Sequence, residues 1–175
     1  MYVSPSDLLG RYSSGERNFA GISFFVNTKP GTMLCEVDLS DIILSGAYLS
    51  NITMHETDFS KATMIGTYLV DSRLYMSDLS GADLTGANLS GAYLGYTNLR
   101  KANLTGANLT GANLTGADMT DVFLESANLS QVDLSRIKLY DKLPRTFGAF
   151  CAENALLWET ILPDGTIERG PRYFI

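Results

Sequence analysis

Residues 82–119 read ADLTGANLSGAYLGYTNLRKANLTGANLTGANLTGADM, and an apolar residue returns at every fifth position of this stretch. The spacing continues in both directions, so that Leu, Met or Phe occupies all 22 central positions from residue 34 to residue 139. A small or β-branched residue stands two positions before each central residue, and Asp or Asn stands directly before it in 12 of the 22 repeats. Such unbroken self-similarity indicates a repeat protein.

A period of five fits neither an α-helix, with about 3.6 residues per turn, nor a flat strand, whose side chains alternate between two faces. Every central residue can point inward only if the chain bends once per repeat, and Gly81 and Gly86 suit such bends because glycine tolerates positive φ. The pattern also recurs every twenty residues, with Asp at 38, 58 and 78. We therefore predict a coil of twenty residues, stacked into a rod roughly 26 Å long at the usual strand spacing.

The pattern over residues 32–141 resembles the A(D/N)LxX motif of the pentapeptide-repeat family. The resemblance implies an all-β solenoid, a right-handed quadrilateral β-helix with four pentapeptides in each coil. Both ends are similar to those of cyanobacterial members, through the segments 8–12, 15–19 and 161–167. This likeness implies a regulatory role directed at another protein.

The ends of a stacked coil need caps, because they expose apolar cross-sections and unpaired strand edges. Ser4 and Pro5 predict the start of a capping helix at about 5–14. Phe19 and Phe24 take central positions in an irregular first coil. The expected organisation is an N-terminal cap at 1–16, a rod at 17–141 with a loop near 27–31, and a C-terminal cap at 142–175. That last cap is expected to hold a tail and two pentapeptides in a shifted register, around Ala155–Leu157 and Thr160–Leu162.

The composition excludes several functions. The 175 residues carry a formal charge of −6, which argues against direct nucleic-acid binding through phosphates. No stretch is long and apolar enough to span a membrane, and no signal peptide is recognisable, so we expect a cytoplasmic protein with no membrane contact. One His and two Cys predict no metal site and no cofactor. A core filled with Leu leaves no cleft, so we expect no catalytic residues; a small hydrolase would need an outward column that forms one.

One group of outward positions departs from the usual polar residues. Tyr and Arg often carry binding energy at interfaces, because they combine a large area with a polar end. Cross-coil stacking of the same Tyr side chains for stability is the structural alternative. The candidate partner surface consists of Tyr48, Tyr68, Arg73, Tyr75, Met76, Tyr93 and Tyr96.

A second group is acidic. It consists of Asp38, Asp41, Asp58, Asp78, Asp118, Asp121 and Asp141. Some pentapeptide-repeat proteins protect DNA gyrase by imitating duplex DNA, which gives this face a possible function. However, seven carboxylates over the rod fall short of the charge density of DNA, about one per 1.7 Å. Four cations on the same face reduce its charge from −7 to −3, and Lys61 should lie beside Asp41 and Lys101 beside Asp121; the four are Lys61, Arg100, Lys101 and Lys138.

The sequence thus predicts a non-enzymatic protein–protein interaction protein or regulatory scaffold. Its partner would be another protein, and the rod itself would be a monomer or a homodimer joined through a capped end. The alternative is a DNA-mimicking inhibitor or protector of a topoisomerase such as gyrase. Replacing the outward Asn108 by Ser is expected to be nearly neutral for stability.

Overall fold

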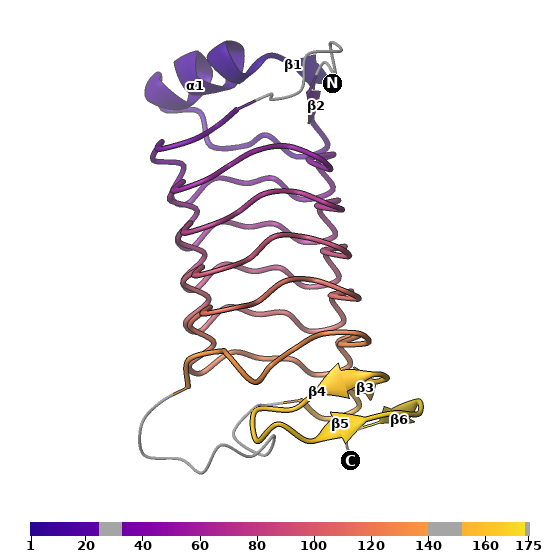
Figure 1. Cartoon of the computed structure of the whole chain (residues 1–175). Helices are drawn as coiled ribbons and strands as arrows, with labels where there is room; N and C mark the ends of the chain where they lie inside the picture. The colour runs from indigo at the N-terminus through magenta and orange to yellow at the C-terminus, as the bar shows by residue number, and fades with distance from the viewer. Residues whose placement is uncertain (25–32, 140–151, 174–175) are drawn as a thin grey trace.

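The computed structural model describes residues 1–24, 33–139 and 152–173. Figure 1 shows a rod of stacked coils with one helix at the N-terminal end and short strands at the C-terminal end. The expected loop near 27–31, most of the connection at 142–153, Asp141 and Cys151 lie outside the described residues. The helix and strands are β1 (Tyr2–Val3), α1 (Pro5–Ser13), β2 (Ser23–Phe24), β3 (Leu156–Leu157), β4 (Thr160–Ile161), β5 (Ile167–Glu168) and β6 (Arg172–Tyr173).

Neighbouring coils are joined by parallel β-bridges between residues twenty apart, for example Asp58 with Asp78. The Leu89 N–H donates to the Asn108 carbonyl at 2.7 Å, and the Asn108 N–H donates to the Ala87 carbonyl at 2.9 Å. Twenty residues are four pentapeptides, so each coil has four sides. The predicted coil of four pentapeptides is therefore confirmed.

Each side carries one column of outward bridge residues, and we name the side after one of them. In chain order the columns are 33/53/73/93/113 (the Tyr93 side), 38/58/78/98/118/138 (the Asp78 side), 43/63/83/103/123 (the Asn103 side) and 48/68/88/108/128 (the Tyr48 side). In a four-sided coil, the Tyr48 side lies opposite the Asp78 side. Residues 55–56, 75–76 and 95–96 turn the chain from the Tyr93 side to the Asp78 side, and we call this edge the Tyr75 corner.

The central residues fill the interior. Leu89 and Leu104 are fully buried, and so is the small residue two positions earlier in most repeats, such as Ala87. The chain bends two residues after each central residue, where φ is positive at all 20 positions from 36 to 131. Gly81 and Gly86, both with φ 65°, occupy this position as predicted.

The Asp or Asn before each central residue has a structural role beyond facing outward. In all 12 cases its Oδ1 accepts a hydrogen bond from the backbone N–H two residues later, at 2.7–3.2 Å. This Asx turn fixes the bend at each corner. Repeats with another residue at this position, such as those of Arg73 and Tyr93, lack this hydrogen bond because the side chain has no Oδ1.

The N-terminal end closes with α1 and an offset first coil. Ser4 caps α1 by accepting from the Asp7 N–H at 3.1 Å, while the Asp7 carboxylate accepts from the Ser4 N–H at 3.2 Å. Phe19 and Phe24 are buried. The first coil pairs with residues 25 positions later, Asn18 with Ile43, and β1 pairs in parallel with β2 below it.

At the C-terminal end the ladder resumes with a larger offset. Leu156 and Ile161 bridge to residues 28 positions earlier, Asn128 and Asp133, and Leu157 is buried. The tail then turns back, so that β6 pairs antiparallel with β3 and β5 pairs antiparallel with β4. These antiparallel pairs occupy the edge that the last parallel coil would otherwise expose.

Candidate protein-interaction surface

The seven residues of the candidate partner surface are all exposed, and the six Tyr and Met side chains are 41–55% exposed. The structure nevertheless divides them among three places. Tyr48 and Tyr68 lie on the Tyr48 side, Arg73 and Tyr93 lie on the Tyr93 side, and Tyr75, Met76 and Tyr96 lie at the Tyr75 corner.

Tyr48 and Tyr68 form a pair of their own. Their ring centroids are 4.6 Å apart and the ring planes differ by 2°, so one face of each ring is covered by the other. This stack matches the structural alternative considered for these residues, because cross-strand aromatic pairs stabilise a β surface by about 0.2–1 kcal/mol. It lies on the side of the rod opposite the acidic column.

At the Tyr75 corner the rings form an edge-to-face ladder over three coils. The centroids of Tyr75 and Tyr96 are 5.6 Å apart at 69°, and those of His55 and Tyr75 are 6.1 Å apart at 61°. The sequence analysis assigns no contact to His55, although its twenty-residue spacing from Tyr75 places the two residues one coil apart.

Small residues in the following coils make room for these rings. A Cβ on Gly95 would lie 3.3 Å from Cδ2 of Tyr75, and a Cβ on Gly116 would lie 2.8 Å from Cδ1 of Tyr96. Gly95 stands where Ser or Thr is usual in this chain. The rings therefore lie along the rod against the next coil rather than standing away from it.

A column of buried hydroxyl groups supports the same corner from inside. Ser77 Oγ donates to the Met54 carbonyl at 2.6 Å, and Thr97 Oγ1 donates to the Leu74 carbonyl at 3.1 Å. One coil earlier, Thr57 Oγ1 donates to the Leu34 carbonyl. These cross-coil bonds hold the backbone beneath Tyr75 and Tyr96 in one arrangement, because a buried hydroxyl must keep its partner.

Two residues of the corner occupy backbone positions that disfavour their side chains. Met76 has φ 59° and Tyr96 has φ 57°, in the left-handed region where 8 of the 20 equivalent positions carry Gly. A side chain with a Cβ costs about 1–2 kcal/mol there relative to the ordinary region. The corner thus keeps bulky apolar side chains where the fold alone favours Gly.

Arg73 and Tyr93 lie one above the other on the adjoining side. The Arg73 guanidinium carbon is 5.6 Å from the Tyr93 ring centroid, within the range of a cation–π contact. Across the described residues, no cation is seated in this way on Tyr75 or Tyr96.

The acidic face contains the expected column, but its ion pairing lies elsewhere. Lys61 and Lys101 occupy the turn positions one coil from Asp41 and Asp121, as expected, yet neither forms an ion pair with its neighbour. Arg100 Nη1 instead lies 3.5 Å from Asp118 Oδ2. This cation reaches the bridge column itself, which also contains Asn98 and ends in Lys138.

Two carboxyl groups of this column have shifted pKa values. Partial burial raises the pKa of Asp118. Hydrogen bonds from the Thr120 hydroxyl and N–H, together with the Arg100 charge, outweigh this effect, so the pKa of Asp118 is lowered overall. The backbone and side-chain hydrogen bonds from Ser40 lower the pKa of Asp38. Both groups are therefore held in the ionised form by the Asx turns.

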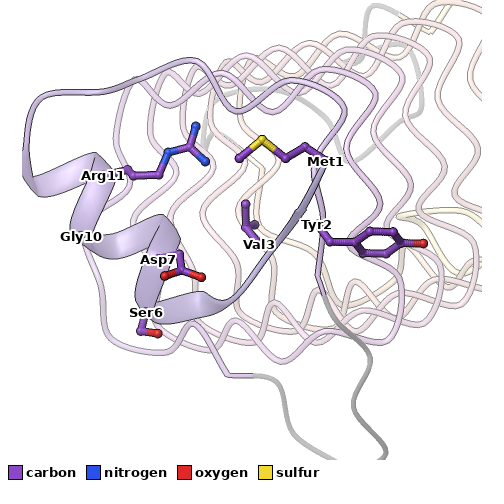
Figure 2. A pocket seen from close by; sticks show the side chains of 7 residues that line it. All are labelled: Met1, Tyr2, Val3, Ser6, Asp7, Gly10 and Arg11. Carbon is purple, nitrogen blue, oxygen red and sulfur yellow. The ribbon is translucent and has the colours of Figure 1, made fainter.

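A hollow of about 430 Å³ opens at the N-terminal cap, between β1 and α1 (Figure 2). Its charged side chains already have partners in the chain. The Arg11 guanidinium donates to the Glu16 carboxylate at 2.7 Å, and the Asp7 carboxylate accepts from Ser4 as described above. Over the described ranges, no cluster of His, Cys, Asp and Glu could hold a metal ion. In the same ranges no helix is long and apolar enough to cross a membrane.

Comparison with known proteins places these features in a family. A profile described as pentapeptide repeats matches eight copies over residues 34–69, 64–95 and 97–136, which is more than half of the chain. No curated protein matches the chain significantly.

Several solved structures are similar to the chain. HetL, a pentapeptide repeat protein involved in heterocyst differentiation regulation in the cyanobacterium Nostoc sp. strain PCC 7120, is 24% identical over 96% of this chain and 100% of its own, with a TM-score of 0.29. A pentapeptide repeat protein of the Arabidopsis thaliana thylakoid lumen is 30% identical over 65% of this chain and 72% of its own, with a TM-score of 0.36. Rfr23 from the cyanobacterium Cyanothece 51142 is 27% identical over 78% of this chain and 95% of its own, with a TM-score of 0.32.

Proposed function

The chain belongs to the pentapeptide-repeat family, and we propose that it is a non-enzymatic protein–protein interaction module whose partner binds at the Tyr75 corner. One observation carries this proposal. Tyr75, Met76 and Tyr96 form an exposed aromatic and apolar cluster on a backbone that hydroxyl bonds hold rigid from inside. Rigid anchors bind well because little conformational freedom is lost on association.

The backbone positions of Met76 and Tyr96 support the same conclusion. Gly at either position would relieve the left-handed strain, so their side chains are kept at a cost to stability. Exposed side chains that are kept at a cost in backbone strain are typical of binding surfaces. Tyr48 and Tyr68 carry no such strain, since neither has a positive φ, and each ring covers one face of the other, so we leave them out of the proposed site.

Imitation of duplex DNA remains the second candidate function. The Asp78 side supports it less, because Asn98 and Lys138 interrupt the acidic column and Arg100 neutralises Asp118. A gyrase supercoiling assay tests it directly, and inhibition at low micromolar concentration would favour this alternative. The cytoplasmic location expected from the sequence stays a prediction.

Affinity capture from extracts of the native cell tests the proposed site. The test variant restores the usual residues at the corner, Tyr75→Ser, Met76→Gly and Tyr96→Gly together. The matched control removes the other aromatic pair, Tyr48→Asn and Tyr68→Asn. We expect the corner variant to stay folded and lose its bound protein, while the control keeps it. Undiminished capture by a folded corner variant would reject the site.

A further inference from the structure

The Tyr75 corner and the acidic column adjoin each other. In each coil the chain passes from the corner to the Asp78 side within two residues, from Met76 to Asp78 and from Glu56 to Asp58. The two surfaces that the sequence suggests as separate candidates therefore share an edge. Tyr48 and Tyr68, in contrast, lie on the opposite side of the rod.

The shared edge carries negative charge. Five carboxylates lie along it over three successive coils, and none of them forms an ion pair with a described residue, although Arg17 interacts electrostatically with Asp38. They are Glu36, Asp38, Glu56, Asp58 and Asp78. Two cations are near this edge: Arg73 lies on the other border with its guanidinium over Tyr93, and Lys61 lies at the far edge of the Asp78 side. A partner that covers this edge must bring positive charge, because burying unpaired carboxylates is costly.

Tyr75 and Tyr96 also favour a positively charged partner, because their rings can bind cations. Arg or Lys is attracted to the face of a Tyr ring, as the Arg73–Tyr93 contact shows within this chain. Neither corner ring has such a cation from the described residues. A cation seated on these rings could also reach the carboxylates across the corner, since long Arg and Lys side chains combine an apolar stem with a charged head.

We propose that the corner and its acidic border together bind a basic segment of a partner protein, in which Arg or Lys side chains alternate with apolar ones. The cations lie on Tyr75 and Tyr96 and face Glu56, Asp58 and Asp78, and an apolar side chain contacts Met76. This inference rests on the proposed function and names the chemistry of its partner.

Fluorescence anisotropy with three short labelled peptides of equal length tests the proposal. In the first peptide Arg alternates with Leu, in the second Glu replaces Arg, and in the third Ser replaces Leu. We expect the Arg–Leu peptide to bind the full chain at least about tenfold more tightly than either of the others, and its affinity to fall with added salt. Equal binding of the three peptides, or no measurable binding of the Arg–Leu peptide, would overturn the proposal.

Three variants locate the binding. Glu56→Gln, Asp58→Asn and Asp78→Asn together remove charge but keep the Oδ1 acceptors used by the Ser60 and Ser80 N–H groups. This variant and the corner variant (Tyr75→Ser, Met76→Gly and Tyr96→Gly) should each lower the affinity for the Arg–Leu peptide about tenfold. The Tyr48→Asn and Tyr68→Asn control should leave that affinity unchanged. Equal loss in the control would mean that the peptide binds exposed Tyr side chains without preference for the corner, which contradicts the proposal.

The same variants separate this inference from the proposed function. Suppose that the corner variant fails to capture the native partner, whereas the variant with Glu56→Gln, Asp58→Asn and Asp78→Asn captures it fully. The proposed site then stands, and the inference that the partner segment is basic is wrong. If the corner variant captures the partner undiminished, both proposals fall.

Discussion

The ring of Tyr96 lies against Gly116 of the next coil, so closely that a Cβ on Gly116 would be 2.8 Å from Cδ1 of the ring. The relationship shows that the corner is packed across coils as well as exposed. Because the contact contributes to the cost of substituting Gly116, free energies of unfolding can report whether the Tyr96 ring lies there.

A double-mutant cycle tests this packing. Gly116→Ala should destabilise the wild-type chain through both its positive φ of 74° and the contact with Tyr96. In the Tyr96→Gly background only the backbone strain remains, so we expect a coupling free energy of about 0.5–3 kcal/mol in chemical denaturation. Additive effects would show that the ring lies elsewhere.

Replacing Met76 by Gly should stabilise the rod. Its φ of 59° favours Gly, and the side chain is exposed, so we expect a gain of about 1 kcal/mol in the free energy of unfolding. Ser126→Gly, with φ 57° on the edge between the Asn103 and Tyr48 sides, is the matched control and should gain similarly. Only Met76→Gly should weaken partner binding. A destabilised Met76→Gly variant would mean that Met76 has a structural role.

The core should respond strongly to truncation. Leu89→Ala leaves a cavity in a rigid stack and should cost about 2–5 kcal/mol in the free energy of unfolding. Asn108→Ser should cost about 0.5–1.5 kcal/mol, because it removes the Oδ1 that accepts from the Thr110 N–H and hydroxyl. Asn108→Asp, which keeps that acceptor, should cost less than Asn108→Ser. Equal costs for Leu89→Ala and Asn108→Ser would contradict the inward assignment of Leu89.

Asp118 should make the rod sensitive to acid. Its folded-state pKa is lower than its unfolded value, so its contribution to stability is complete above the unfolded pKa and is lost as pH falls through the folded pKa. Asp118→Asn keeps an oxygen acceptor for the Thr120 N–H but does not titrate. Urea denaturation from neutral pH to below the ordinary Asp pKa should show a smaller loss of stability in Asp118→Asn than in wild type. Parallel loss in both proteins would exclude Asp118 as a source of acid sensitivity.

The sequence predicts the coil well because one physical requirement repeats in every pentapeptide. Each central Leu must be buried, and a twenty-residue spacing places identical residues above one another, as the bridge between Asp58 and Asp78 confirms. The Asx turns could not be inferred in this way. An outward Asp or Asn is consistent with solvation alone, and only the structure shows that Oδ1 holds the next bend, so Asn108→Ser is no longer expected to be neutral.

The sequence predicts the seven residues as one candidate surface, whereas the structure divides them among three places. Departures from the usual residues select the seven positions, yet exposure alone does not say which side of a four-sided coil they share. The coil places Tyr48 opposite the Asp78 side and Tyr75 beside it. The ring contact of His55 could not be predicted from its own repeat, because it depends on Tyr75 one coil away.

Hydroxyl-radical footprinting of the chain, free and bound to its captured partner, tests the central claim most directly, because Tyr and Met side chains react according to their exposure. The account predicts that Tyr75, Met76 and Tyr96 become protected in the complex, whereas Tyr48 and Tyr68, on another side of the rod, keep the reactivity of the free protein. Protection of Tyr48 and Tyr68 with Tyr75, Met76 and Tyr96 unchanged would contradict it.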